Sequence, residues 1–520
     1  MGKICLDDML GYGHDHFVWI TPRYNLINAS PFGHKAVLFE PAMEHNGTAE
    51  QKARWLPLAR SGKIMGTYAQ TELGQGSFVR GIETTATFDR DTDEFVIHSS
   101  TVSSAKFWPA GLGFSTTHGT VMARLIVGDK DHGPHLFVVQ LRSIDDGKPI
   151  PGIKMGDVGL KLGYNEADNG FATFKNVHAP RSHMLMAHSQ VSRNGTYTKD
   201  PLRAKLSYLV MLLVRGKMPG VFTVQLAQAT TIATRYSVVR EQDLAVRWPW
   251  VHGYFWLTGG TTFEGENYVL WQQVGRHLLK QLDRFQDGES IEPQMQYLTN
   301  SKDYNAACTA SGEQFLDAEV QLSIYRNRAH RLIVKAHTAI RSSGRTLAEA
   351  WNEHMMLHIS ASRAHIEYLV LKSFGDTIAS LPDTTSSNLG TVLSHVCSLF
   401  ALSTVINPRS VDALSFLETN GTQAPYLNCV QLDTIRALVN DLLDKLLPDA
   451  IALTDAWDFS DTSLCSTLGM YNGDVYGNMM RWVEQLPINQ KVWENDGVQE
   501  GWKDWVDPIL KQEMEAKAKL

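Results

Sequence analysis

The chain has 520 residues, a net charge of −7 at pH 7 and a composition of 43% hydrophobic and 20% charged residues. One hydrophobic core rarely serves more than about 250–300 residues, so the length predicts several domains. The composition is that of an ordinary globular protein. The acidic balance gives no reason to expect nucleic acid as a partner.

The cysteines and apolar runs exclude two further classes of protein. The five cysteines are scattered without the spacing of a metal site or a disulfide framework, which indicates a reducing compartment. The longest apolar runs, 209–214 and 396–402, are much shorter than the roughly 18 residues of a membrane-spanning helix. We therefore expect no membrane span.

In chain order, the first 66 residues are mixed, with a helical stretch at 49–61. Short β-rich runs then follow, separated by turn formers at 129–134 and at Asp168-Asn-Gly. These runs are 83–88, 94–98, 120–127, 135–141 and 170–177. Their close spacing predicts a small barrel or sandwich.

From about residue 200 the hydrophobic period becomes helical. The predicted helices are 221–236, 268–285, 311–341, 346–373, 391–400 and 429–453, with a loop at 380–388. The fold class is therefore α+β and multidomain: a helical N-terminal segment, a central β-barrel or sandwich domain, and two C-terminal helical bundles. The predicted domains are 1–66, 67–190, 191–300 and 301–520.

The segment 66–77 is rich in glycine and hydroxyl side chains on a strand-to-loop passage. Such residues allow the backbone to approach a flat ligand closely and supply donors for its polar edge. A glycine-bearing hairpin is the alternative reading of the same residues.

Thr67-Tyr-Ala-Gln-Thr-Glu72, followed by Gly74-x-Gly76-Ser77, resembles the flavin-binding signature of the peroxisomal acyl-CoA oxidases. Lys106-Phe-Trp-Pro-Ala-Gly111 resembles the next flavin element of that family, with Ala110 where the family usually has glycine. The resemblance implies FAD as the cofactor. The residues it places against FAD are Tyr68, Ala69, Gln70, Thr71, Gly76, Ser77, Ala110 and Gly111.

Two later segments resemble family elements that bind the substrate and the cofactor. The stretch 201–208 and Arg215 resemble the acyl-CoA cleft, although a helix with snorkelling basic ends would look the same. The implied substrate contacts are Lys205, Leu206, Ser207, Tyr208 and Arg215, of which Lys205 and Arg215 suit the CoA phosphates. Arg240 takes the place of an arginine that reaches FAD, often that of a neighbouring subunit.

Thr261-Thr-Phe-Glu-Gly-Glu266 resembles the turn that supplies the catalytic base of the family. Glu264 is thereby implied to take the α proton of the acyl thioester, with Glu266 near the cofactor. A base for such a weakly acidic proton must be held in a dry cleft. Without the family context, Glu-Gly-Glu is more typical of a solvated turn.

The C-terminal part also matches the family. The segments 455–464 and 468–476 resemble the terminal bundle of the oxidases, which acyl-CoA dehydrogenases lack. The chain closes with Ala518-Lys519-Leu520, a tripeptide of the kind that the peroxisomal import receptor recognises. Chance at the end of a polar helix is the alternative.

Two departures from the family pattern stand out. Only 243–251 separate Gln242 from His252-Gly-Tyr, where the family has several helices that bind FAD and form the dimer. The segment before residue 20 also differs from the family's first helices. We therefore predict a truncated N-terminal segment, an internal deletion, weak FAD binding and slow turnover.

The resemblance implies an FAD-dependent acyl-CoA oxidase that converts fatty acyl-CoA and molecular oxygen to trans-2-enoyl-CoA and hydrogen peroxide in peroxisomal β-oxidation. The alternatives are an acyl-CoA dehydrogenase, or an impaired subunit that binds FAD or acyl-CoA beside an intact oxidase. A homodimer or a hetero-oligomer with other acyl-CoA oxidases is expected. No metal site is predicted, because His14 with His16 and His354 with His358 lack a third ligand at suitable spacing.

Overall fold

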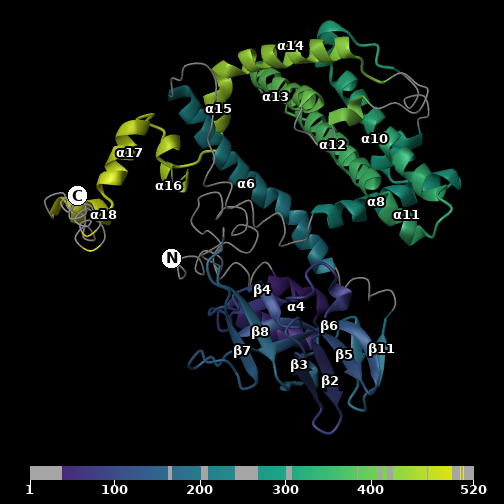
Figure 1. Cartoon of the computed structure of the whole chain (residues 1–520), viewed down its shortest axis with the longest axis vertical. Helices are drawn as coiled ribbons and strands as arrows, with labels where there is room; N and C mark the ends of the chain where they lie inside the picture. Colours follow the sequence, from purple (N-terminus) through teal and green to yellow (C-terminus); the bar gives the residue numbers. More distant parts are fainter. Residues whose placement is uncertain are drawn as a thin grey trace, which may run out of the picture. The chain divides into compact units, whose positions relative to one another are not determined.

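The computed structural model describes residues 38–161, 167–200, 209–239, 267–299, 307–382, 384–407, 413–417, 425–464 and 466–494, together with 504 and 508. The chain divides into two compact units, Met1–Gly259 with Leu453–Leu520, and Gly260–Ala452. Figure 1 follows the chain through both units by colour. The four predicted domains are not tested by this division and stay predictions.

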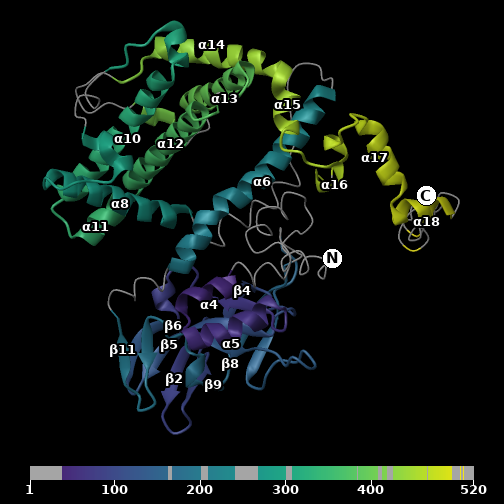
Figure 2. The same ribbon diagram turned by 180° about the vertical axis from the view of Figure 1, so that it is seen from behind.

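In the described part of the chain, two helices precede the β region, α4 (Glu40–Asn46) and α5 (Ala49–Arg60). Thr48 begins α5 with a capping box, in which its hydroxyl accepts from the N–H of Gln51 and the Gln51 side chain accepts from the N–H of Thr48. Apolar residues of both helices form a core with Leu136 and Val138 of the sheet. The two helices therefore cover one face of the β region, as Figure 2 shows.

A six-stranded sheet is built around one long strand, β5. β5 pairs in parallel with β1 and then with β2 along one edge, and antiparallel with β6 along the other. The order continues from β2 through β3 to β9. The strands are β1 (Gly66–Ala69), β2 (Thr85–Asp89), β3 (Glu94–His98), β5 (His118–Val127), β6 (Lys130–Gln140) and β9 (Val177–Pro180).

Two smaller sheets complete the β region. The order β4-β8-β7 forms a three-stranded sheet and β10-β11 a hairpin. Their bounds are β4 (Lys106–Ala110), β7 (Ile153–Asp157), β8 (Asn169–Phe174), β10 (Ser189–Val191) and β11 (Tyr197–Lys199), with short 3-10 turns at η2 (Val79–Gly81) and η3 (Arg181–His183). Alternate residues of β5 point into one core with Phe95, Phe137 and Phe174 from the facing strands. The predicted α+β class is confirmed, with a β-sandwich between helical regions.

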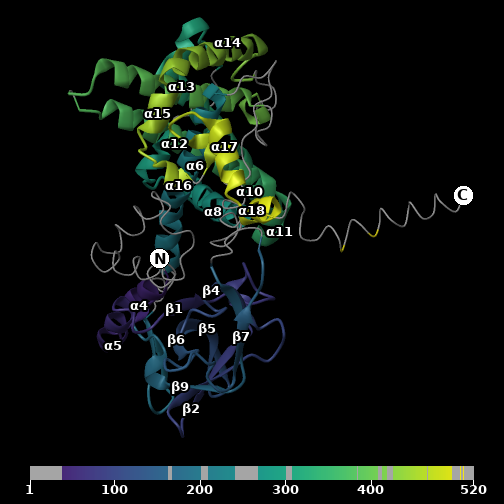
Figure 3. The ribbon, with the colours of Figure 1, turned by 90° about the vertical axis from the view of Figure 1, so that its left-hand side faces the viewer.

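Helix α6 (Leu209–Val239) follows the β region and packs against the C-terminal segment of the first unit. The buried Arg235 donates to the Asp455 carboxylate (2.8 Å) and to the Gly469 carbonyl (2.7 Å). These bonds tie residues more than 200 positions apart. The segment contains α15 (Ala450–Asp455), which begins in the second unit, then α16 (Asp461–Leu464), η9 (Thr467–Gly469), α17 (Val475–Glu484) and α18 (Pro487–Glu494), seen from the side in Figure 3.

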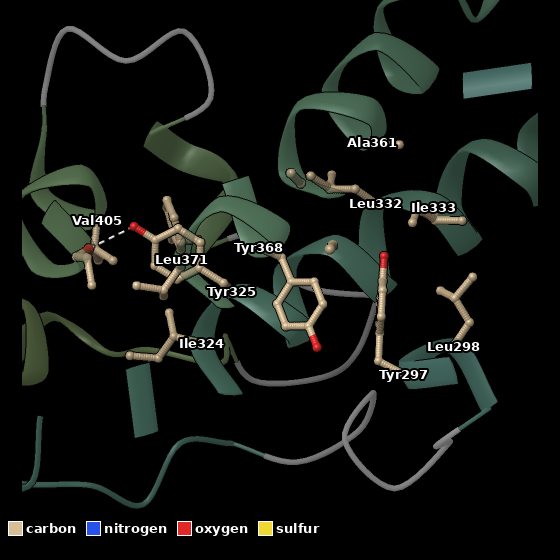
Figure 4. Close-up of a cluster of buried hydrophobic side chains, with 14 of the residues drawn as sticks. Tyr297, Leu298, Ile324, Tyr325, Leu332, Ile333, Ala361, Tyr368, Leu371 and Val405 are labelled. Atoms are coloured by element: carbon tan, nitrogen blue, oxygen red, sulfur yellow. Dashed lines mark hydrogen bonds between the residues drawn. The ribbon is translucent and has the colours of Figure 1, made fainter. Parts of the chain in front are cut away.

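The second unit is helical. Its core contains Tyr297, Tyr325 and Tyr368, drawn in Figure 4 among aliphatic side chains. The buried Tyr325 hydroxyl donates to the Ala401 carbonyl at 2.8 Å. The elements are α8 (Asn267–Gln286), α10 (Ala318–Arg341), α11 (Leu347–Glu353), α12 (Met355–Ala379), α13 (Ser387–Ile406) and α14 (Cys429–Leu446), with η5 (Pro293–Thr299), η6 (Gly312–Leu316), η7 (Ala413–Phe416) and η8 (Leu447–Asp449).

Helix α13 is, among the described residues, the one helix long and apolar enough to cross a bilayer, with a mean hydropathy of 1.8. The search of the sequence for uninterrupted apolar runs missed this helix, because serine, threonine and histidine interrupt its apolar residues. Cys397, Ala401 and Leu402 of this helix are buried in the core of the second unit. About one third of its apolar window, 33%, is buried within the described structure.

The predicted strand 94–98 coincides with β3, and the predicted helix 268–285 lies within one residue of α8. The predicted helix 221–236 was too short, since α6 begins at Leu209. The predicted helix 346–373 is two helices, α11 and α12.

One turn prediction and one strand prediction were wrong. The hairpin after β5 turns at Gly128 and Asp129 alone, so the polar run 130–134 already belongs to β6. The predicted strand 170–177 is two strands, β8 and β9, separated by a bend at 175–176 where Asn176 has a φ of 52°.

Acid sensitivity of the second unit follows from two buried histidines on α12. Burial lowers the pKa of both His358 and His365 to about 4, whereas an unfolded histidine titrates near 6.5. The unfolded chain therefore binds more protons between these values, so stability is full above pH 6.5 and is lost as the pH falls towards 4.

We expect the free energy of unfolding of this unit to fall by about 1–2 kcal/mol per histidine between pH 7 and pH 5, measured by denaturant titration. His365→Gln removes one titrating group and should flatten the pH dependence. An equal dependence in variant and parent would contradict the assignment.

Candidate functional site: two flavin elements of the beta region

The first predicted flavin element runs along β1 and the loop after it. β1 lies parallel to β5, with Tyr68 opposite Thr120. Gly66 is required at its start, because a Cβ there would lie 2.2 Å from the ring of the buried Phe39. The Tyr68 hydroxyl donates to Oε1 of Gln70 at 3.1 Å. Ala69 is buried, whereas Tyr68, Gln70 and Thr71 are half-buried.

The second predicted element lies beside the first. The Thr67 hydroxyl donates to the Ala110 carbonyl at 2.6 Å, and the N–H of Phe107 donates to the Thr71 carbonyl at 3.0 Å. The two motifs are separated by about 40 residues in the sequence. The structure therefore brings together Tyr68 to Thr71 and Ala110 with Gly111.

A buried ion pair joins the two elements. The side chains of Glu72 and Lys106 are both fully buried, and Nζ of Lys106 lies 2.9 Å from Oε1 of Glu72. The ammonium also donates to the carbonyls of Gln70 (3.1 Å) and Met122 (2.6 Å). The Glu72 carboxylate accepts from two further backbone N–H groups, those of Glu83 and Thr84. Burial lowers the pKa of Lys106 to about 8, and the charge of Glu72 opposes this shift.

Strand β4 contains a bulge at Trp108. Phe107 pairs with Phe171 and Ala110 with Asn169, so β4 has one residue more than β8 in this interval. Trp108 has a φ of 86°, a left-handed conformation that is unfavourable for a bulky residue. The Trp-Pro pair of this motif is thus part of a bulge within a strand.

Asp168 holds the loop that follows β4. One of its carboxylate oxygens accepts from the N–H groups of Phe114 and Ser115, both at 2.8 Å. Its carbonyl accepts from the N–H groups of Gly111 and Gly113, both at 3.0 Å. Gly111 has a φ of 88°, so glycine is favoured at this position. The loop after Ala110 is therefore fixed by Asp168.

Both elements carry large apolar side chains that are exposed. Leu73, Phe78, Trp108 and Phe114 are 51%, 63%, 37% and 70% exposed. Gly76 and Ser77 are also exposed, and a Cβ at Gly76 would meet no atom within 4 Å. Exposed aromatic groups beside open backbone fit a flat cofactor such as FAD, which would cover them.

The remaining predicted site residues are only partly described. Arg215 lies in α6 and is partly buried. Those outside the described residues are Lys205, Leu206, Ser207, Tyr208, Arg240, Glu264, Glu266, Ala518, Lys519 and Leu520. No group of three metal-ligating side chains occurs in the described part of the chain.

Sequence reasoning missed two residues of this region. Asp168 and Asn169 were read as turn formers, but Asp168 binds the loop after β4 and Asn169 begins β8. The signal was present in the sequence, since Asp and Asn are the side chains that most often hydrogen-bond to nearby backbone. Their partners, however, lie some 55 residues earlier.

Comparison with known proteins decides the family. The family models that match are Acyl-CoA oxidase (residues 317–511), Acyl-coenzyme A oxidase N-terminal (7–65) and Acyl-CoA oxidase, C-alpha1 domain (208–247). Peroxisomal acyl-coenzyme A oxidase 1 of Homo sapiens is 32% identical, with 92% of this chain and 85% of that protein covered. The chain belongs to the acyl-CoA oxidase family. The predicted FAD-dependent oxidation of acyl-CoA is confirmed by this membership.

Solved structures agree. Acyl-CoA oxidase 1 of Arabidopsis thaliana has a TM-score of 0.83 and 28% identity, over 98% of this chain and 91% of that one. Acyl-CoA oxidase-2 of Caenorhabditis elegans, bound with FAD, ascaroside-CoA and ATP, has a TM-score of 0.82 and 27% identity, over 96% and 88%. The alignment with the human relative spans 575 positions, more than the 520 residues of this chain. The relative therefore has residues within the aligned stretch that this chain lacks.

The buried ion pair can be tested by substitution. Lys106→Met should cost about 3–5 kcal/mol of stability, because it leaves the Glu72 carboxylate buried without its cation. The double variant Glu72→Gln, Lys106→Met should recover part of this loss. Lys148→Met, which removes an ion pair whose lysine is 80% exposed, should change stability by less than about 0.5 kcal/mol. Denaturant unfolding measures the free energy of unfolding of all three variants. Equal losses of stability in Lys106→Met and Lys148→Met would show that the buried ion pair stabilises the fold no more than an exposed one.

Proposed function

We propose specific residue roles for the oxidation of fatty acyl-CoA to trans-2-enoyl-CoA by this chain, with molecular oxygen as the final electron acceptor and hydrogen peroxide as the second product. Glu264 is the base that takes the α proton of the thioester. Bound FAD supplies the acceptor for the hydride that leaves the β carbon. The observation that carries the proposal is the contact of the two flavin elements through Thr67 and Ala110.

The chain's own groups would hold the cofactor at these elements. Tyr68, Gln70 and Thr71 offer polar atoms close to the surface, and Gly76 leaves room for a close approach. The other proposed contacts are Ala69, Ser77, Ala110, Gly111, Arg240 and Glu266. Arg240 suits the pyrophosphate, since a guanidinium forms paired bonds with phosphate oxygens.

The substrate would be held through its CoA part and its thioester. Lys205 and Arg215 supply positive charge for the phosphates, while Leu206, Ser207 and Tyr208 line the cleft. Lys199, a few residues earlier in the sequence, lines a recess of about 370 Å³ formed by 187–190 and 198–200. The ascaroside-CoA in the Caenorhabditis elegans relative supports a CoA thioester as the ligand.

Two alternatives are separated by simple measurements. An acyl-CoA dehydrogenase would need an added electron acceptor, whereas an oxidase consumes oxygen alone. A subunit without activity would bind FAD or acyl-CoA and show turnover only beside an intact oxidase. A homodimer or hetero-oligomer is part of the proposal, because the resemblance implies that Arg240 reaches FAD, often that of a neighbouring subunit.

The role of Glu264 gives the sharpest test of the reaction. Glu264→Gln should lower kcat by a factor on the order of 10²–10⁴, the usual contribution of a positioned base, while FAD content by visible absorbance stays unchanged. Glu313→Gln, at an exposed glutamate with no assigned role in the site, is the matched control and should leave kcat unchanged. Equal losses in both variants would reject Glu264 as the base. Peroxide formation from an acyl-CoA measures the activity.

The peroxisomal location is proposed from the names of the relatives and from Ala518-Lys519-Leu520, which the import receptor would bind. Deletion of Leu520 should leave the protein in the cytosol, because the receptor reads the terminal carboxylate and leucine together. Fluorescence microscopy of an N-terminally tagged chain measures this. Unchanged peroxisomal import of the deletion variant would show that another signal carries the protein.

A further inference from the structure

Trp108 is held in an unfavourable backbone conformation at the edge of the flavin elements. Among the described residues, the non-glycine positions with positive φ are Asp93, Trp108, Asn176 and Asp458. Asn and Asp tolerate this region because their short side chains bond locally, but tryptophan does not. Some other group must therefore hold Trp108 in place.

The side chain of Asn169 is that group. Its Nδ2 donates to the Trp108 carbonyl at 2.6 Å, across the bulge where Asn169 pairs with Ala110. Asn169 is 6% exposed, so water does not compete for this bond. The bond fixes the peptide that follows the strained residue.

The residues on either side of Asn169 lock the same turn. Asp168 binds the N–H groups of Gly111 and Gly113 through its carbonyl. The lack of a side chain at Gly170 allows β8 to lie close to the loop after β4 and to β7. A Cβ at this position would lie 2.4 Å from the nitrogen of Gly113 and 2.5 Å from the carbonyl oxygen of Gly156. Asp168, Asn169 and Gly170 together thus brace residues 108–115 from behind.

This arrangement has a second cost besides the strain at Trp108. Oδ1 of Asn169 is buried and has no hydrogen-bond partner within the described structure. A buried acceptor without a donor is unfavourable, and such groups are rare in native proteins. The strained backbone of Trp108 and the unpaired Oδ1 of Asn169 lie at the two ends of one hydrogen bond. Both reduce stability, which indicates that this local geometry serves a purpose other than stability.

We propose that Asn169 is a positioning residue that holds Trp108 in its left-handed conformation, so that the partly exposed indole forms a fixed wall of the flavin site. The inference rests on the proposed place of FAD at 67–77 and 106–111. Asn169 does not touch the cofactor; it acts through the Trp108 backbone.

The test is a double-mutant cycle on Asn169 and Trp108. Asn169→Asp keeps the shape but points a carboxylate oxygen at the Trp108 carbonyl, and Trp108→Gly removes both the strain and the indole. Titration of the apoprotein with FAD should show about tenfold weaker binding for Asn169→Asp, equivalent to one lost hydrogen bond to a neutral partner. Trp108→Gly, which removes the indole itself, should weaken binding at least as much. The double variant should bind FAD no more weakly than Trp108→Gly, because no indole is left for the bond of Asn169 to position.

The thermal midpoint of the apoprotein supplies a readout that does not need FAD. Asn169→Asp should lower the midpoint more when Trp108 is present than in the Trp108→Gly background. The residue-108 carbonyl remains in both backgrounds, but glycine adopts this φ without a bond to hold it. Asn194→Asp is the control for the added charge, since the exposed Asn194 side chain accepts bonds through its oxygen, which aspartate retains. It should change neither FAD binding nor the midpoint.

The outcomes separate the two proposals. Additive effects of the two substitutions, or FAD binding by Asn169→Asp equal to that of the parent, would overturn the role of Asn169. A parent protein that binds no FAD would overturn the proposed cofactor site, and the thermal cycle would then decide alone whether Asn169 holds Trp108.

Discussion

The buried ammonium of Lys106 determines how the β region is assembled around the flavin elements. A charge taken out of water is tolerated only when its donors are bonded, and Lys106 finds its acceptors on Gln70, Glu72 and Met122. These belong to the loop after β1 and to β5, while Lys106 itself begins β4. Any shift of one of these segments would break a bond to a buried charge. The relative position of the two motifs is thus set by electrostatics within the core.

A rigid support of this kind explains how strain can persist beside it. The left-handed Trp108 lies two residues after Lys106, and the N–H of Phe107 between them is bonded to the Thr71 carbonyl. The backbone before the bulge is therefore fixed, and Asp168 fixes the backbone after it. Strain between two fixed ends cannot relax by a local shift. The ion pair at Lys106 fixes one end of the stretch 107–110, and Asp168 fixes the other end at Gly111.

The part of this arrangement that depends on local pattern could be predicted from the sequence. Alternation of apolar and polar residues predicted the strand 94–98, and the helical period of apolar residues predicted helices in the second unit. The motif at 67–77 and the motif at 106–111 were found by resemblance, and the structure brings them into contact. The bracing residues could not be assigned in this way. Asp168-Asn-Gly has the local chemistry of a turn, and only the pairing of β8 with β4 directs these side chains at residues some 55 positions earlier.

The bracing of the flavin elements also bears on the residues that this chain lacks relative to its relatives. The bonds that position Tyr68 to Thr71 and Ala110 come from the loop after β1, β4, β5 and β8, all within the β region. None of these described bonds is made by a helix after residue 200, so they do not depend on helical residues. If the residues that this chain lacks are helical, as the sequence predicts between Gln242 and His252, the β surface that meets the flavin keeps its shape. The cost of the loss would then fall on closure over the cofactor and on exclusion of water from the base.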